Sequence, residues 1–194
     1  MEVIAMAIPD VKLIRPVRHG DARGYFSEVY NRRTFSAAGL DLDFIQDNQS
    51  LSAPVGTLRG LHFQSPPVAQ TKLIRVLKGA IFDVAVDLRR GSPWYGKHVT
   101  IELRAGTADQ FLVPKGFAHG FVTIEPDTEA FYKVDAYYSA AHDHGLLWND
   151  PDLGITWPAR LGEITLSSKD RAQPRWRDFV SPFLYENQGK EQAA

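Results

Sequence analysis

The chain of 194 residues contains no cysteine. That absence excludes disulfides, thiolate zinc sites and cysteine nucleophiles together. An excess of either charge is also missing, because 22 Lys and Arg stand against 23 Asp and Glu. A dedicated nucleic-acid-binding protein normally presents a strongly basic face, so we expect no nucleic acid among the partners. A local basic pocket for a small anionic ligand is compatible with this balance.

Long apolar runs are absent as well. No window approaches the roughly 18 uncharged apolar residues that a membrane span needs, so we expect no membrane partner. The N-terminus places Glu2 where a signal peptide carries positive charge, and its apolar stretch stops at Pro9. We therefore expect a cytoplasmic protein. The length predicts one domain, over residues 1–185, followed by a polar and frayed tail at residues 186–194.

What is present is a period of two. Apolar and polar residues alternate through Ile81–Leu88 and again through His98–Arg104, and Gly- and Pro-containing turn signals separate such runs. Helix signals are few: the best lies over Asn31–Gly39, and a further turn is expected near Ser139–His142. The pattern predicts an all-β fold, an antiparallel sandwich or small barrel with a few short helices, whose interior can hold a ligand.

Three segments place polar residues inside such strands. In Thr57–Gln64, Arg59 and His62 lie around Gly60. The two side chains point to opposite faces of a regular strand, so sharing a pocket requires a bulge at Gly60. Taken by itself, His62 is better interpreted as a hydrogen-bonded core histidine than as a functional residue.

The second segment, Phe111–Phe121, carries a Pro-x-Gly-x-x-His pattern that ends at His119. It resembles the second conserved motif of cupins, in whose metal-binding members this histidine is a ligand. Their first motif supplies two further histidines and a glutamate, whereas here His62 is followed by Phe63 and Gln64. Two imidazoles are too few for a secure first-row metal site, so no metal is predicted.

The third segment is Thr128–Tyr138. Alternation places Tyr132 and Tyr138 on its more apolar face, with their hydroxyls pointing into the barrel. The alternative is that these tyrosines only pack, because tyrosine is a good strand former.

Together these segments resemble a known family, the dTDP-4-dehydrorhamnose 3,5-epimerases. The similarity runs from about Ile8 to Asp170. It rests on blocks that recur in order and spacing: Gly20–Glu28, Gln46–Asn48, Leu58–Gln64, Phe82–Asp87, Pro114–Phe121 and Trp148–Pro151.

The resemblance implies a cupin-type jelly roll that acts as a cofactor-independent isomerase. Its substrate would be a dTDP-linked 4-keto-6-deoxyhexose, converted by proton abstraction and return at the carbons flanking the ketone during activated-sugar synthesis. It also implies that His62 is the base and Asp170 holds it, that Tyr132 is the acid, and that Lys72 stabilises the enolate. For Lys72 and Asp170 the plainer interpretations are a surface lysine and a turn or helix cap.

The substrate-binding residues follow from the same resemblance, which also implies a homodimer with exchange of an N-terminal strand. Arg23, Phe26 and Glu28 would then reach the pocket of the partner. Asp143 stands where the family usually has glutamate, so it is expected to reach its partner through water; the flanking His142 and His144 are expected at the surface. The implied set is Arg23, Phe26, Glu28, Gln46, Asp47, Asn48, Arg59, His119, Tyr138, Asp143 and Lys169.

Three other functions stay open at this point. One is an epimerase that inverts a single carbon of a related 4-keto sugar nucleotide. The second is a metal-dependent cupin oxygenase, and the third is a module that binds sugar nucleotides without turnover. The number of ring carbons that incorporate deuterium distinguishes the first from the double epimerase. Elemental analysis of the purified protein tests the second, and unchanged binding in a His62→Ala variant tests the third.

Overall fold

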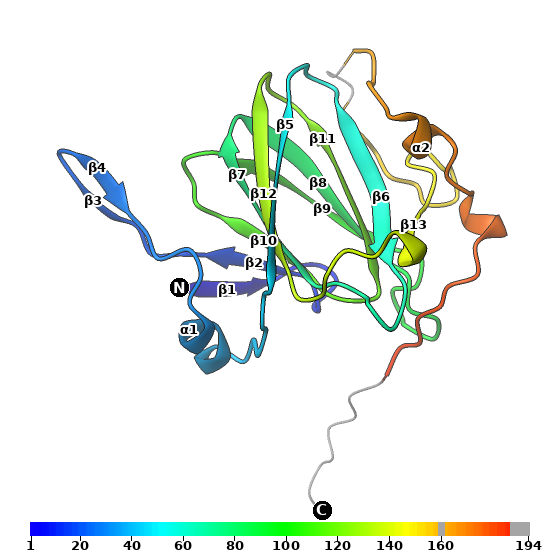
Figure 1. Cartoon of the computed structure of the whole chain (residues 1–194), viewed down its shortest axis with the longest axis horizontal. Helices are drawn as coiled ribbons and strands as arrows, with labels where there is room; N and C mark the ends of the chain where they lie inside the picture. The colour runs from blue at the N-terminus through cyan, green and yellow to red at the C-terminus, as the bar shows by residue number, and fades with distance from the viewer. Residues whose placement is uncertain (159–161, 187–194) are drawn as a thin grey trace, which may run out of the picture.

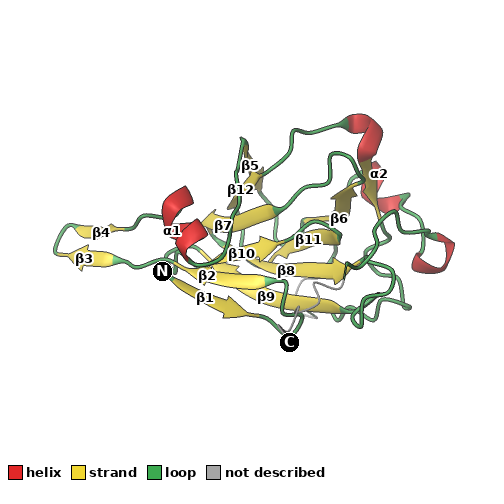
Figure 2. Cartoon of the chain, turned by 90° about the horizontal axis from the view of Figure 1, so that it is seen from below, coloured by secondary structure: helices red, strands yellow, loops and turns green. Residues whose placement is uncertain are grey.

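The computed structural model describes residues 1–158 and 162–186, so the expected tail lies outside the described residues except for Glu186. Two antiparallel sheets face each other (Figure 1, Figure 2). The first has the order β1 (Glu2–Ala5), β2 (Lys12–Arg15), β10 (Gln110–Val113), β7 (Lys72–Lys78), β12 (Thr128–Val134) and β5 (Gln46–Ser52). The second has the order β13 (Asp143–Gly145), β6 (Leu58–Gln64), β11 (Phe117–Thr123), β8 (Ala80–Asp87) and β9 (His98–Arg104). The antiparallel all-β sandwich predicted from the period of two is confirmed.

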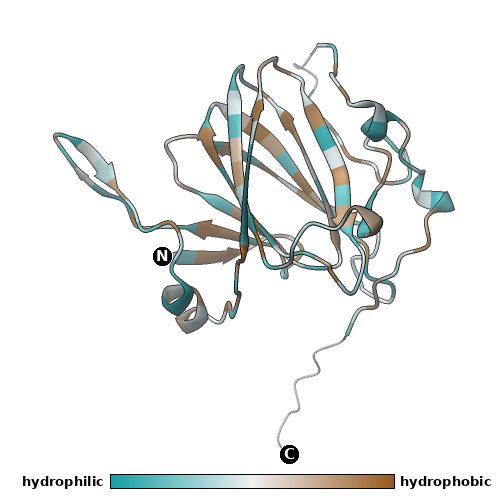
Figure 3. Cartoon of the chain, in the orientation of Figure 1, coloured by the Kyte–Doolittle hydropathy of each residue, from teal (hydrophilic) through white to brown (hydrophobic). Residues whose placement is uncertain are grey.

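The core lies between the sheets. Ile74 of β7 and Phe111 of β10 pack there against Ile81 and Ala85 of β8. Val84 and Val86, which alternate with the inward-facing residues of β8, face outward and are also buried, under a C-terminal segment that contributes Phe183. The predicted alternation along β8 is therefore correct, but both faces are covered rather than one. Figure 3 shows apolar stretches along most strands, whereas β6 alternates between polar and apolar residues.

The predicted helix is α1 (Arg32–Ala37). The side chain of Asn31 accepts hydrogen bonds from the first backbone amides, and Gly39 follows the last turn with φ +79°, a conformation that glycine adopts without strain. The expected turn near Ser139 is a 3₁₀ helix, η1 (Ala140–His142). Among the described residues, two further short helices carry no strong sequence signal: α2 (Ser168–Arg171) and η3 (Trp176–Asp178).

A hairpin of β3 (His19–Asp21) and β4 (Gly24–Phe26) projects from the sandwich (Figure 1, Figure 2). All six strand residues of this hairpin are exposed. It pairs with neither large sheet, so its conformation contributes little to the core of its own chain.

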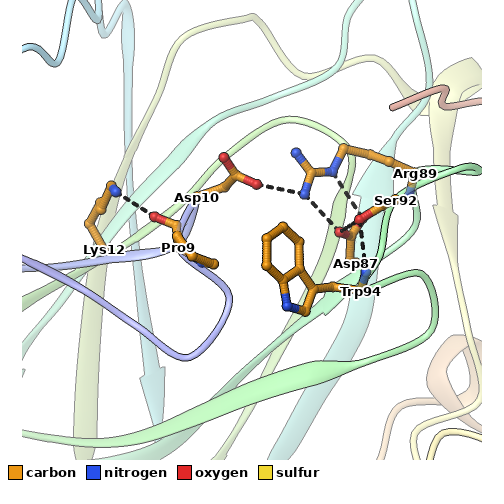
Figure 4. Close-up of polar contacts among 7 residues, drawn as sticks. All are labelled: Pro9, Asp10, Lys12, Asp87, Arg89, Ser92 and Trp94. Carbon is orange, nitrogen blue, oxygen red and sulfur yellow. Dashed lines mark hydrogen bonds and ion pairs between the residues drawn. The ribbon is translucent and has the colours of Figure 1, made fainter. Parts of the chain in front are cut away.

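A buried ion pair anchors the N-terminal segment to the end of β8 (Figure 4). The carboxylate of Asp87 is fully buried and accepts two hydrogen bonds from the guanidinium of Arg89, at 2.9 and 2.7 Å, and one from Ser92 at 2.7 Å. The backbone N–H of Arg89 donates a further one at 2.9 Å. Arg89 also donates to Asp10, at 2.8 Å. Burial alone would lower the pKa of Arg89, but both carboxylates hold it above its ordinary value. The guanidinium therefore neutralises Asp87 at every physiological pH.

Candidate active site

The cavity lies between the two sheets and has two connected parts. One part has a volume of about 310 Å³ and the other about 270 Å³. His62, Lys72 and Tyr132 line both of them. The first part is also lined by the amide side chains of Gln46, Asn48, Gln64 and Gln70 and, at its mouth, by Tyr138 and Asp143. The second takes a more cationic set of Ser50, Arg59, His119, Ser167, Lys169 and Asp170.

A bulge in β6 brings Arg59 and His62 into the same cavity. His62 pairs with His119 of β11, and Arg59 pairs with Phe121, so three steps along β6 match two along β11. Gly60 has φ +130°, and a Cβ there would lie 2.5 Å from the Cα of Gly120. Only glycine meets both conditions, because other residues avoid this φ and carry the colliding atom. The bulge predicted at Gly60 is confirmed.

The imidazole of His62 meets the carboxylate of Asp170, with 2.5 Å between Nε2 and Oδ1. The two residues are 108 positions apart, and α2 carries the aspartate to the edge of β6. Asp170 is only 4% exposed. Burial raises the pKa of its carboxyl, but hydrogen bonds from His62 and Ser167 outweigh burial and hold the pKa below its ordinary value. An ionised Asp170 only accepts, so Nε2 carries the proton and Nδ1 is the basic nitrogen.

Lys72 and Tyr132 lie with this pair in the cavity. Burial lowers the pKa of Lys72 to about 8, although the carboxylates of Asp143 and Asp83 act to raise it. Its ammonium makes no hydrogen bond or ion pair with any residue in the described part of the chain. Burial also raises the pKa of Tyr132, against the opposing effect of Arg59. Near pH 7 the cavity therefore holds a charged lysine and a protonated phenol.

A second histidine–aspartate pair lies deeper. Nε2 of His119 is 2.6 Å from Oδ1 of Asp83, and both residues are buried. The other carboxylate oxygen of Asp83 is buried and has no partner among residues 1–158 and 162–186. The sequence interpretation assigned no function to Asp83. The sequence did contain a signal for Asp83, because alternation places it on the same inward face of the strand as Ile81 and Ala85. A carboxylate on a buried face needs a partner, which marks it as a candidate functional residue.

Alternate residues over Gln46–Ser50 of strand β5 line the cavity. Gln46 and Asn48 line it and hydrogen-bond to each other at 2.9 Å, and Ser50 follows at the same spacing. Ser50 was not predicted, although its parity with Gln46 and Asn48 was readable in the sequence. Asp47 points to the opposite face, where it accepts a hydrogen bond from Lys133 at 2.8 Å. Asp47, expected among the substrate-binding residues, therefore does not line the cavity of its own chain.

The mouth of the cavity differs from expectation in two ways. Tyr138 is 59% exposed, because β12 ends at Val134 and strand alternation no longer directs the chain beyond that residue. Its hydroxyl does not point into the barrel but donates to Asp143 at 3.1 Å. Asp143 also accepts from Lys169 at 2.5 Å, so it contacts both of these neighbours directly, and its expected contact through water stays a prediction. The expected surface position holds for His144, whereas His142 is half-buried and contacts Ser139.

The residues of the hairpin region do not line this cavity in their own chain. Arg23 forms an ion pair with Asp21 at 2.5 Å, and Phe26 is 71% exposed. The carboxylate of Glu28 accepts from the side chain of Asn31 at 3.0 Å, beside α1.

No group of three or more histidine, aspartate or glutamate side chains is placed to hold a metal ion in the described ranges. None of the helices in those ranges combines the length and the apolar character needed to cross a membrane.

Comparison with known proteins places this geometry in a family. The sequence model of the dTDP-4-dehydrorhamnose 3,5-epimerases matches residues 5–178. The chain belongs to this family. The family's enzyme from Sinorhizobium fredii is 52% identical over 181 residues, which cover 93% of this chain and 92% of the relative.

Solved structures agree. An epimerase from Legionella pneumophila in complex with dTDP-4-keto-L-rhamnose is 39% identical, with a TM-score of 0.89, over 95% of this chain and 99% of that one. A 3′-monoepimerase from Streptomyces bikiniensis in complex with dTDP-quinovose is 32% identical, with a TM-score of 0.83, over 89% and 86%. The epimerase family thus includes relatives of this chain that differ in the number of carbons inverted.

Proposed function

We propose that this chain is a dTDP-4-dehydrorhamnose 3,5-epimerase. It would invert the two ring carbons that flank the ketone of dTDP-4-dehydro-6-deoxyglucose. The observation that carries this proposal is the presence of His62 with its carboxylate partner, the phenol of Tyr132 and the charged Lys72 in one cavity. A binding module needs no such combination of base, acid and cation.

The first step is removal of a proton from the carbon next to the ketone. Nδ1 of His62 accepts it, and Asp170 stabilises the imidazolium that forms. The electron pair of the broken C–H bond moves into the ring and places negative charge on the ketone oxygen. Lys72 is the cation proposed to face that oxygen. In enzymes that stabilise an oxyanion, removal of a single donor costs about 3–4 kcal/mol of transition-state stabilisation, and the charge of Lys72 would make a contribution of this kind.

The second step returns a proton to the opposite face of the same carbon. Tyr132 is the proposed donor, because its raised pKa keeps the phenol protonated until an enolate is present. The resulting phenolate regains a proton from water, and the imidazolium of His62 releases one, so the enzyme returns to its starting state. The same sequence at the second carbon completes the double inversion.

The nucleotide would be held by the remaining polar residues. Arg59, His119 and Lys169 suit a diphosphate, because they bring donors and positive charge to one part of the cavity. The amides of Gln46 and Asn48 suit a hydrogen-bonding edge, and the exposed ring of Tyr138 suits stacking on a base.

The hairpin supports the proposal of a homodimer. Its residues Arg23 and Phe26 are exposed and distant from the cavity of their own chain, as a loop that completes the site of a second copy would be. The hairpin is the segment proposed to reach the second copy. Exchange of the N-terminal strand stays a prediction, since β1 pairs with β2 of the same chain and lies at the edge of its sheet. The cytoplasmic location stays a prediction.

Proton exchange tests the function. The protein would be incubated with dTDP-4-dehydro-6-deoxyglucose in D₂O, and NMR would follow label at the two ring carbons. We expect label at both, a loss of about 10²–10⁴-fold in exchange for His62→Ala, and retained exchange with lost inversion for Tyr132→Phe. Tyr137→Phe is the matched control, because Tyr137 is 68% exposed and lines neither part of the cavity.

Absence of label with the unaltered protein would contradict the function. Label at one carbon would favour a single-carbon epimerase, which the similarity to the monoepimerase makes the second candidate. Equal loss of exchange in Tyr132→Phe and His62→Ala would contradict the division between acid and base.

A further inference from the structure

The second oxygen of the Asp170 carboxylate has a partner of its own. Oγ of Ser167 lies 2.8 Å from Oδ2 of Asp170 and 3.1 Å from the backbone nitrogen of the same residue. The backbone N–H can only donate, so the hydroxyl oxygen accepts there. The single hydroxyl proton is then free to point at the carboxylate. Ser167 therefore caps α2 and donates to Asp170 at the same time.

This arrangement fixes the plane of the carboxylate. Oδ2 is held by Ser167, and Oδ1 faces Nε2 of His62 at 2.5 Å. Rotation of the carboxylate about its Cβ–Cγ bond would break both contacts together. The helix that carries Asp170 has only four residues, and the ion pair of Lys169 with Asp143, at 2.5 Å, also ties it to β13. A short helix with few core contacts gives little other restraint on this side chain.

We propose that Ser167 is a positioning residue of the epimerase, whose hydroxyl locks Asp170 so that His62 keeps its proton on Nε2 and offers Nδ1 to the sugar. The inference rests on the proposed function and deepens it. Ser167 acts through Asp170, not on the reacting carbon. Loss of the hydroxyl leaves the base and its carboxylate in place but lets the carboxylate rotate, so His62 samples both neutral tautomers.

The test uses Ser167→Ala and Ser167→Thr, with Ser168→Ala as the matched control on the exposed neighbouring residue. We expect Ser167→Ala to lower kcat about tenfold with KM changed less than twofold, and Ser167→Thr to restore kcat to within about threefold. A complete change of tautomer costs about 10⁴-fold in a hydrolase triad, and a partial loss of restraint costs less. In ¹⁵N-histidine NMR of the free protein, His62 is expected in the Nε2–H form, and in a tautomer mixture after Ser167→Ala.

The Ser167→Gly variant distinguishes the loss of the helix cap from the loss of the hydrogen bond to Asp170. Glycine caps a helix almost as well as serine but carries no hydroxyl, so this variant should keep the urea midpoint and lose kcat as the alanine variant does. Full kcat in Ser167→Gly, or an unchanged tautomer in Ser167→Ala, would overturn the proposal. Failure of the unaltered protein to exchange deuterium would instead overturn the function, and the tautomer measurement needs no substrate.

Discussion

Replacement of Lys72 by methionine should make the protein more stable and much less active. Lys72 is half-buried, its ammonium has no hydrogen-bonding partner in the described ranges, and its pKa lies at about 8 instead of 10.5. A difference of that size corresponds to about 3 kcal/mol by which folding disfavours the charged form. Methionine keeps the length and the apolar stem and removes the charge.

The net gain is smaller than this figure. The carboxylates of the buried Asp83 and the half-buried Asp143 lose a neighbouring cation in Lys72→Met, and the charge of each then becomes less favourable. We expect the free energy of unfolding at pH 7 to rise by about 1–2 kcal/mol. That gain raises Tm by a few degrees, because about 1 kcal/mol shifts Tm by about 2–4 °C in a chain of this length.

The stability advantage of Lys72→Met should decrease as pH rises. Because the folded pKa is lowered, the cost of the charged lysine is fully present below pH 8 and decreases as pH rises from about 8 to 10.5. Urea unfolding of both proteins at pH 7 and pH 10 should therefore show an advantage for Lys72→Met that shrinks at the higher pH. Lys78→Met is the control, since Lys78 ends the same strand and is exposed.

Activity should change in the opposite direction. Loss of the charge that faces the enolate is expected to lower kcat about 10²–10³-fold in the deuterium assay. In the unaltered enzyme, kcat/KM should fall above about pH 8 as Lys72 loses its proton, and Lys72→Arg should move that fall to higher pH. A stability difference that does not vary with pH, or full activity in Lys72→Met, would refute the reasoning.

Two further predictions concern the framework and are measured by urea unfolding. Gly60→Ala should cost about 3 kcal/mol or more, because the new Cβ meets the backbone of Gly120; Gly91→Ala shares the positive φ but points into open space, so an equal loss would contradict the collision. Arg89→Met should cost about 3–5 kcal/mol by leaving the buried Asp87 charge uncompensated. Addition of Asp87→Asn should recover part of that loss, and failure to recover any would show that packing, not charge, dominates.

Features set by neighbouring residues were readable in the sequence. The alternation over Ile81–Leu88 predicted a strand, and Asn31 and Gly39 marked the ends of α1, because strand parity and helix caps depend on backbone geometry over a few residues. The bulge at Gly60 followed from the same local rule. The resemblance to a family added the pairing of His62 with Asp170, which no local pattern contains.

Only the tertiary structure decided which side chains meet. The chain leaves β12 at Val134, and Tyr138 therefore turns out to the mouth and contacts Asp143. The partner of His119 became visible only when β8 and β11 were paired and brought Asp83 against it. Periodicity gives the face on which a side chain lies while the chain stays in a strand. The contact across that face depends on the register of distant strands, and such registers are selected by the packing of the whole core.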